Sequence, residues 1–289
     1  MATTSHDRLV ADPVSTHVTL HAAAVALFVR DLAATTRFYR DVLGLSVIGQ
    51  DTTHVGLGVD GVAFLDLLHR PNARPDDPAS AGLFHTAFLL PTRSDLGRWL
   101  DHARRTGVQV EGAADHLVSE AIYLSDPEGN GIEVYCDRPA TEWGWTGPAE
   151  ARRIDMANKP LDFAAILAAA TAPWTGAPSG TRIGHVHLRV GDTQQAAQFY
   201  TGVLGLAVTK IWPEAVFLST GFYHHHIAAN VWRSAGAAQR DPARAGLASL
   251  TMQAADATIA DAIAARSDQP LADLRDPWGT QINITIAQH

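Results

Sequence analysis

The chain has 289 residues, of which 46% are hydrophobic and 18% are charged, and its formal net charge is −8. This length corresponds to about two average domains, and the composition excludes a disordered chain. A mildly acidic chain without a basic block is not expected to bind nucleic acid or an anionic membrane. The single cysteine, Cys136, excludes an intramolecular disulfide. No apolar run approaches the roughly 20 residues that a membrane span needs, and residues 1–12 do not resemble a secretory signal peptide. Since a single cysteine also fits a reducing cytosol, we expect a cytoplasmic protein.

An internal repeat organises the chain. Residues 38–45 (FYRDVLGL) recur as residues 199–206 (FYTGVLGL), and residues 126–129 (DPEG) recur as residues 276–279 (DPWG). Self-similarity of this kind indicates that both halves of the sequence share one structural plan. We therefore predict an N-terminal half over residues 1–140, a linker over 141–180 and a C-terminal half over 181–289.

The hydrophobic pattern divides each half into two modules of one strand, one helix and three strands. The modules begin near residues 22, 84, 183 and 247. In the first module the elements are expected at residues 25–29, 32–43, 46–48, 54–57 and 62–68. In the second they are expected at residues 85–90, 94–106, 108–110, 120–124 and 131–135. A short helix is expected in the linker over residues 161–170.

These motifs carry a resemblance to a known family. The repeated FY…VLGL phrase, followed by residues 126–133 (DPEGNGIE), resembles the vicinal oxygen chelate superfamily. That superfamily includes glyoxalase I, fosfomycin resistance proteins and extradiol dioxygenases. Residues 123–133 (YLSDPEGNGIE) and 221–227 (GFYHHHI) are most similar to type I extradiol dioxygenases of the catechol 2,3-dioxygenase kind. The resemblance implies an α+β fold in which four βαβββ modules form two β-cups.

The resemblance also implies where a metal would bind. In this family one His lies on the first strand of an odd module, a second His lies on the first strand of an even module, and a Glu lies on the last strand of that even module. The second module has His85 and Glu133 at these positions, and the third has His185. Two histidines and one carboxylate suit non-haem Fe(II), because they leave coordination positions open. We therefore expect these three residues as metal ligands.

The corresponding positions in the first and fourth modules are not adequate ligands. They are Ala24, Ser249 and Asn283. The expected site therefore joins modules 2 and 3 across the two sequence halves, either within one chain or between two chains of a dimer. His187 follows His185 by two residues, so both point to the same face of a strand. The family register favours His185 as the ligand. His187 then either faces the same cavity, where it would bind substrate, or simply packs.

Three further side chains match catalytic positions of the family. Residues 224–228 (HHHIA) resemble the extradiol His-His-x-aliphatic-Ala signature, in which His225 matches the acid–base histidine. We expect these histidines on the strand that closes the third module. Tyr123 lies ten residues before Glu133, and His116 lies seven residues before Tyr123. Both are expected to orient the substrate and to stabilise negative charge that develops on oxygen.

The implied activity is ring cleavage of catechol or a substituted catechol by O2 outside the two hydroxyls. Fe(II) is the expected cofactor, with Mn(II) as the alternative, and a homodimer or higher homo-oligomer is expected. Two other functions stay open: a glyoxalase-like metal-dependent isomerase or lyase, and a non-catalytic binding protein of the bleomycin-resistance type. Metal content and oxygen uptake with catechol discriminate among the three.

Overall fold

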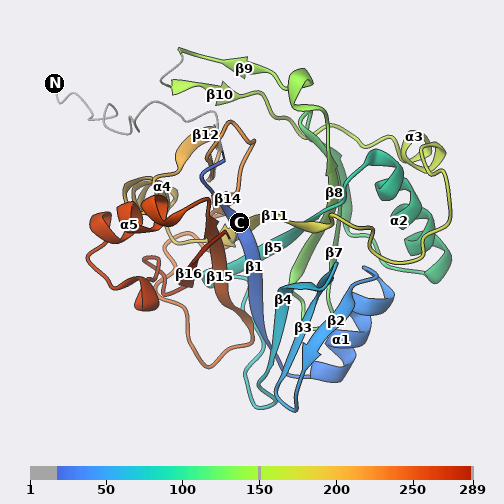
Figure 1. The fold of residues 1–289 in the computed structure, drawn as a ribbon, viewed down its shortest axis with the longest axis horizontal. Helices are drawn as coiled ribbons and strands as arrows, with labels where there is room; N and C mark the ends of the chain where they lie inside the picture. The colour runs from blue at the N-terminus through green and yellow to red at the C-terminus, as the bar shows by residue number, and fades with distance from the viewer. Residues whose placement is uncertain (1–17, 149–150, 288–289) are drawn as a thin grey trace.

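The computed structural model describes residues 18–148 and 151–287 of the chain. Within these residues it has five α-helices, and each begins after an aspartate or threonine whose side chain accepts a hydrogen bond from the first turn. The helices are α1 (Leu32–Asp41), α2 (Arg93–Thr106), α3 (Phe163–Ala168), α4 (Thr193–Gly202) and α5 (Ala257–Arg266). In Figure 1, α1 and α2 lie on one side of the molecule, and α4 and α5 lie on the other. No helix in this described part is long and apolar enough to cross a membrane.

The strands form two large sheets. An eight-stranded sheet has the order β12-β13-β14-β11-β5-β8-β7-β6, and a six-stranded sheet has the order β16-β15-β1-β4-β3-β2. The strands of the larger sheet are β5 (Gly82–Leu89), β6 (Gly112–Asp115), β7 (Ser119–Ser125), β8 (Gly131–Asp137), β11 (Arg182–Arg189), β12 (Ala207–Trp212), β13 (Ala215–Ser219) and β14 (Ile227–Asn230). Those of the smaller sheet are β1 (Leu20–Val29), β2 (Ser46–Gln50), β3 (His54–Val59), β4 (Val62–His69), β15 (Gly246–Ala254) and β16 (Gln281–Ile286). The linker adds a small sheet of β9 (Trp145–Thr146) and β10 (Arg153–Ile154).

The pairing of strands shows how the modules combine. In each module the first and last strands pair in parallel: β1 with β4, β5 with β8, β11 with β14, and β15 with β16. Two antiparallel contacts then join the modules, β5 with β11 and β1 with β15. Modules 2 and 3 therefore share the eight-stranded sheet within one chain, and modules 1 and 4 share the six-stranded sheet. The expected pairing across the sequence halves is confirmed.

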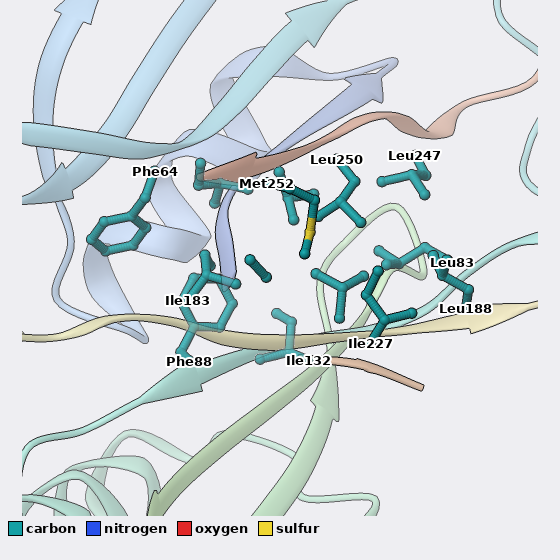
Figure 2. Packing of buried hydrophobic residues seen from close by; sticks show 14 of the residues in the cluster. Phe64, Leu83, Phe88, Ile132, Ile183, Leu188, Ile227, Leu247, Leu250 and Met252 are labelled. Atoms are coloured by element: carbon teal, nitrogen blue, oxygen red, sulfur yellow. The ribbon is translucent and has the colours of Figure 1, made fainter. Parts of the chain in front are cut away.

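The main core lies between the two sheets. Figure 2 shows Leu250 and Met252 of β15 facing Ile183 of β11 and Phe88 of β5. These four side chains are at most 2% exposed. Each such burial contributes roughly 1.5–3 kcal/mol relative to an exposed side chain. One face of each sheet is therefore used for the core, and the opposite face of the eight-stranded sheet is left for the candidate site.

The repeated sequence motif has a structural role. The hydroxyl of Tyr39 donates to Asp126 at 3.1 Å, and the hydroxyl of Tyr200 donates to Asp276 at 3.0 Å. Asp126 also accepts hydrogen bonds from the backbone N–H groups of its own turn, as Asp276 does. All four side chains are buried. The FY and DP motifs therefore tie the helix of an odd module to the last turn of the even module in the same sequence half.

Three elements differ from the sequence-based expectations. The strand expected at residues 108–110 is wrong: that segment has no regular secondary structure, and strand pairing starts at Gly112 opposite Tyr123. The fourth module is shortened, because the residues between α5 and β16 form a 3₁₀ turn (Leu271–Asp273) instead of two strands. The three histidines expected on a strand precede it, since β14 begins only at Ile227. The linker helix is confirmed as α3.

A glycine sets the close approach of β5 and β8, the two strands that carry His85 and Glu133. A Cβ added at Gly131 would lie 2.1 Å from the carbonyl oxygen of Phe84. Gly131→Ala must push these backbones apart, and we expect it to lower the free energy of unfolding by about 1–3 kcal/mol. Gly49→Ala, where an added Cβ meets nothing within 4 Å, is the matched control. Equal denaturant midpoints for the two variants would contradict this prediction.

Candidate metal centre

Three neighbouring strands of the eight-stranded sheet bring together His85, Glu133 and His185. Strand β5 lies between β8 and β11, and its Ala87 is paired with both Glu133 and His185. Glu133 Oε2 lies 3.0 Å from His85 Nε2 and 3.2 Å from His185 Nε2. One ligand atom from each residue lies within 4.8 Å of the others, and all three side chains are buried. The predicted ligands thus form one compact donor group.

The surroundings of His85 Nε2 indicate whether this donor group fits a metal. Among the described residues, buried His85 Nε2 has no hydrogen-bond partner, although Glu133 Oε2 is only 3.0 Å away. The contact is close in distance but lacks hydrogen-bond geometry. A buried polar atom without a partner is costly unless another group satisfies it. A divalent ion shared with Glu133 and His185 would do so, and the donor set fits one.

The protonation states also suit metal binding. Burial lowers the pKa of His185 to about 4, so its imidazole is neutral and its lone pair is available at neutral pH. Burial by itself raises the pKa of Glu133, but His185 and His85 outweigh this effect and hold that pKa well below its usual range. Glu133 is therefore an ionised carboxylate. Metal ligands must be deprotonated in this way.

His187 occupies a different position from His185. Its ring lines the same cavity, as expected from their spacing, but its Nε2 accepts a hydrogen bond from the Asn230 amide at 3.0 Å. It is not part of the donor group formed by His85, Glu133 and His185. The geometry therefore agrees with the family register, which favours His185 as a ligand and leaves His187 in the cavity wall.

The donor group opens onto a cavity of about 600 Å³. Ala113 of β6 and Trp212 of β12 both line it, although these strands are the two edges of the sheet. The sheet is therefore curled into a cup. Its wall carries the aromatic rings of Phe84, Trp212, Phe217 and Trp232. A mostly apolar concave cavity with a few convergent polar groups is typical of a small-molecule site.

Tyr123 and His116 form a hydrogen-bonded pair in this cavity. His116 Nδ1 lies 3.0 Å from the carbonyl oxygen of Ala157, and its Nε2 lies 2.6 Å from the Tyr123 hydroxyl. A carbonyl can only accept, so Nδ1 carries the proton and Nε2 accepts from Tyr123. Burial raises the pKa of Tyr123 well above its ordinary value, so the phenol keeps its proton. The linker, through Ala157, thus helps to orient a predicted site residue.

His225 also faces the cavity, although it is not on a strand. Its ring centroid lies 4.0 Å from that of His185 and 5.0 Å from that of Phe217. Only the middle histidine of the 224–226 run lines the cavity. Burial and the neighbouring histidines hold the pKa of His225 well below its ordinary value, so the ring is neutral at neutral pH.

Sequence reasoning missed a second group of polar residues beneath the cavity. These are Tyr135, Asp137, Tyr223 and His224, which hydrogen-bond to one another or to site histidines. Tyr135 and Asp137 could have been found from the sequence, because residues 133, 135 and 137 alternate along β8 and their side chains therefore share one face. The linker residues Met156, Ala157 and Asn158, which also line the cavity, carried no such signal.

His226, which points away from the cavity, makes stability dependent on pH. Burial, with a smaller effect from His21, lowers its pKa from 6.5 to about 3. The unfolded chain therefore binds a proton that the folded chain excludes, and stability falls as the pH drops below 6.5. Between pH 7.5 and pH 5 we expect the unfolding free energy of His226→Leu to fall by about 2 kcal/mol less than that of the wild type. Unfolding free energies of both proteins at pH 7.5 and 5 test this, and a constant difference between them would contradict it.

Comparison with known sequences places the chain in a family. The profile of the Glyoxalase/Bleomycin resistance protein/Dioxygenase superfamily matches residues 19–134 and 182–284. These segments correspond to the first two and the last two modules. The chain therefore belongs to this superfamily, as its motifs and its curled sheets indicate.

Two sequence relatives and one solved structure are similar to this chain. The chain is 37% identical over 238 residues to catechol-2,3-dioxygenase of Bacillus subtilis (strain 168), which covers 81% of this chain and 82% of that protein. It is 34% identical over 127 residues to biphenyl-2,3-diol 1,2-dioxygenase 3 of Rhodococcus globerulus, or 43% of this chain and 67% of that protein. Glyoxalase I from Zea mays superposes with a TM-score of 0.54 at 15% identity, covering 93% and 92% of the two chains. The last match shows the fold alone, whereas both sequence relatives are named as dioxygenases.

Proposed function

We propose that this chain is a metal-dependent extradiol dioxygenase that opens the ring of catechol or a substituted catechol with O2. The observation that supports it most is the buried His85 nitrogen without a hydrogen-bond partner, beside Glu133 and His185, on the wall of a cavity that also holds His225. Homology to two diol-cleaving dioxygenases supports the same class of reaction.

The proposed cofactor is Fe(II), with Mn(II) as the alternative, held by His85, Glu133 and His185. When bound, the ion would supply a centre on which the diol and O2 meet in a fixed geometry. All three donors come from one chain, so the proposed activity does not require the dimer expected from the family.

The protein groups would act on the diol around this centre. His225, neutral at neutral pH, would accept a proton from a diol hydroxyl and return it to oxygen during ring opening. The Tyr123 hydroxyl, which donates to His116 Nε2 in this structure, would turn its proton toward a substrate oxygen when a diol binds and stabilise negative charge there. The rings of Phe217 and Trp232 would pack against the aromatic substrate and exclude water.

Anaerobic reconstitution of the protein with Fe(II), followed by oxygen-electrode assays with catechol, tests this proposal. The expected result is oxygen uptake with formation of a yellow ring-cleaved product, which His85→Ala abolishes. Stoichiometric metal binding without uptake or ring cleavage would contradict the dioxygenase and favour isomerase chemistry. Absence of metal binding would contradict the whole site and favour a non-catalytic binding protein.

A further inference from the structure

A network of hydrogen bonds beneath the cavity converges on one carboxylate. Asp137 is the last residue of β8, four positions after Glu133. Its Oδ1 lies 3.0 Å from His224 Nε2, and its Oδ2 accepts from the Tyr223 hydroxyl at 2.9 Å. His224 is 0% exposed, so its ring has no access to solvent. Two separate chains of hydrogen bonds lead from this carboxylate to the site.

The first chain leads to His225. An ionised carboxylate can only accept, so His224 Nε2 carries the proton toward Asp137. In a neutral imidazole the other nitrogen is then an acceptor. His224 Nδ1 lies 2.8 Å from His225 Nδ1, so His225 Nδ1 must be the donor in this contact. This arrangement leaves His225 Nε2 as the nitrogen with a free lone pair, which is the form that a base requires.

The second chain leads to His185. Because Tyr223 donates to Asp137, its oxygen accepts from the Tyr135 hydroxyl, which lies 2.8 Å away. The Tyr135 oxygen can then accept from His185 Nδ1 at 3.3 Å. His185 Nε2 lies 3.2 Å from Glu133, a carboxylate that can only accept, so in the metal-free protein Nε2 carries the proton. Metal ligation needs that nitrogen free, so the proton must then sit on Nδ1, where the Tyr135 oxygen can accept it.

We propose that Asp137 is a positioning residue: it fixes His225 as the Nδ1–H tautomer, with its Nε2 lone pair free, and it lets His185 adopt the Nδ1–H tautomer that metal binding requires. The role toward His185 and the consequence for catalysis rest on the proposed function, but the tautomer of His225 does not. Residue 137 must accept from both His224 and Tyr223, and a carboxylate has an acceptor oxygen for each. The partners of metal-ligating histidines set which ring nitrogen is protonated in the same way.

Asp137→Asn tests the proposal because an amide of nearly the same shape accepts at one end and donates at the other. If the amide N–H faces His224, the first chain reverses and His225 carries its proton on Nε2. If the N–H faces Tyr223, the second chain reverses, Tyr135 donates to His185 Nδ1, and His185 can no longer free its Nε2 for a metal. In either orientation one of the two histidines loses the form that the site requires.

Nitrogen-15 NMR of histidine side chains in the full-length, metal-free protein measures this directly, with signals assigned by His225→Gln and His185→Gln. In the metal-free wild type we expect Nδ1–H at His225 and Nε2–H, facing Glu133, at His185; when Zn(II) is added we expect Nδ1–H at both. In Asp137→Asn we expect Nε2–H at His225 or failure of His185 to change tautomer with Zn(II), and in Asp101→Asn, which alters a carboxylate of α2 outside this network, we expect no change. An Nε2–H tautomer at His225 in the wild type, or wild-type behaviour of both histidines in Asp137→Asn, would overturn the proposal.

Kinetics and metal titration then test the consequence. We expect Asp137→Asn to lower kcat or the affinity for Mn(II) roughly 10- to 100-fold, with little change in the KM for catechol. Unchanged kcat and unchanged metal affinity despite an altered tautomer would overturn the positioning role. A wild-type protein that has the expected tautomers but cleaves no catechol would reject the proposed function and leave the tautomer assignment intact.

Discussion

Glu133→Gln is expected to weaken the binding of Fe(II) or Mn(II) by more than about 100-fold and to abolish ring cleavage. Glutamine keeps the shape of glutamate, so the cup should fold as before, but the only carboxylate of the donor group is lost. Loss of partners that merely support a ligand costs about 10- to 100-fold in affinity, and loss of the ligand itself should cost more. Isothermal titration of the anaerobic protein with metal measures the change.

The six-stranded sheet supplies the matched control. Asn283 occupies the position on β16 that corresponds to Glu133 on β8, and among the described residues no donor group forms in that sheet. Asn283→Gln should therefore leave metal affinity and activity unchanged. Equal metal affinity in Glu133→Gln and the wild type would show that Glu133 is not a ligand.

His225→Gln is expected to lower kcat by about 10²- to 10⁴-fold, the usual contribution of a positioned acid–base group, while metal binding stays intact. The ring of His225 faces the cavity and is not one of the donors that surround Glu133. Glutamine retains hydrogen bonding but cannot take up a proton at neutral pH. Steady-state oxygen uptake on the Fe(II)-loaded protein measures the loss.

The neighbouring histidine is the control for this variant. His226→Leu changes a buried ring of the same run that does not line the cavity. At pH 7.5 it should retain kcat close to that of the wild type. If His225→Gln were as active as His226→Leu, the acid–base role of His225 would be wrong.

The donor group was predicted from the family resemblance, which implies the ligand positions, together with the internal repeat. The repeat aligns His185 with Ala24, and the family pattern gives His85 and Glu133 as the ligand positions of the second module. Comparison of all four modules then left modules 2 and 3 as the pair with a complete set. The strand order confirms that pairing.

Other features depend on contacts between distant segments and could not be predicted. Asp137 meets Tyr223 and His224 only because β8 of module 2 and the loop before β14 of module 3 fold together. Ala157 reaches His116 from the linker, whose course carries no periodic signal. The strand expected over 224–226 fails for a local reason, since Phe222 adopts a left-handed turn with φ of 57° and His224 hydrogen-bonds to Asp137.

The central claim is that one metal centre spans the two sequence halves through modules 2 and 3. The most direct test is an anomalous difference map from crystals grown anaerobically with Fe(II). The structure predicts a single strong peak within bonding distance, about 2 Å, of His85 Nε2, Glu133 Oε2 and His185 Nε2. His185, His224 and His225 also have ligand atoms within 4.8 Å of one another. A peak bound by that group instead, or one in the cup of modules 1 and 4, would contradict this account.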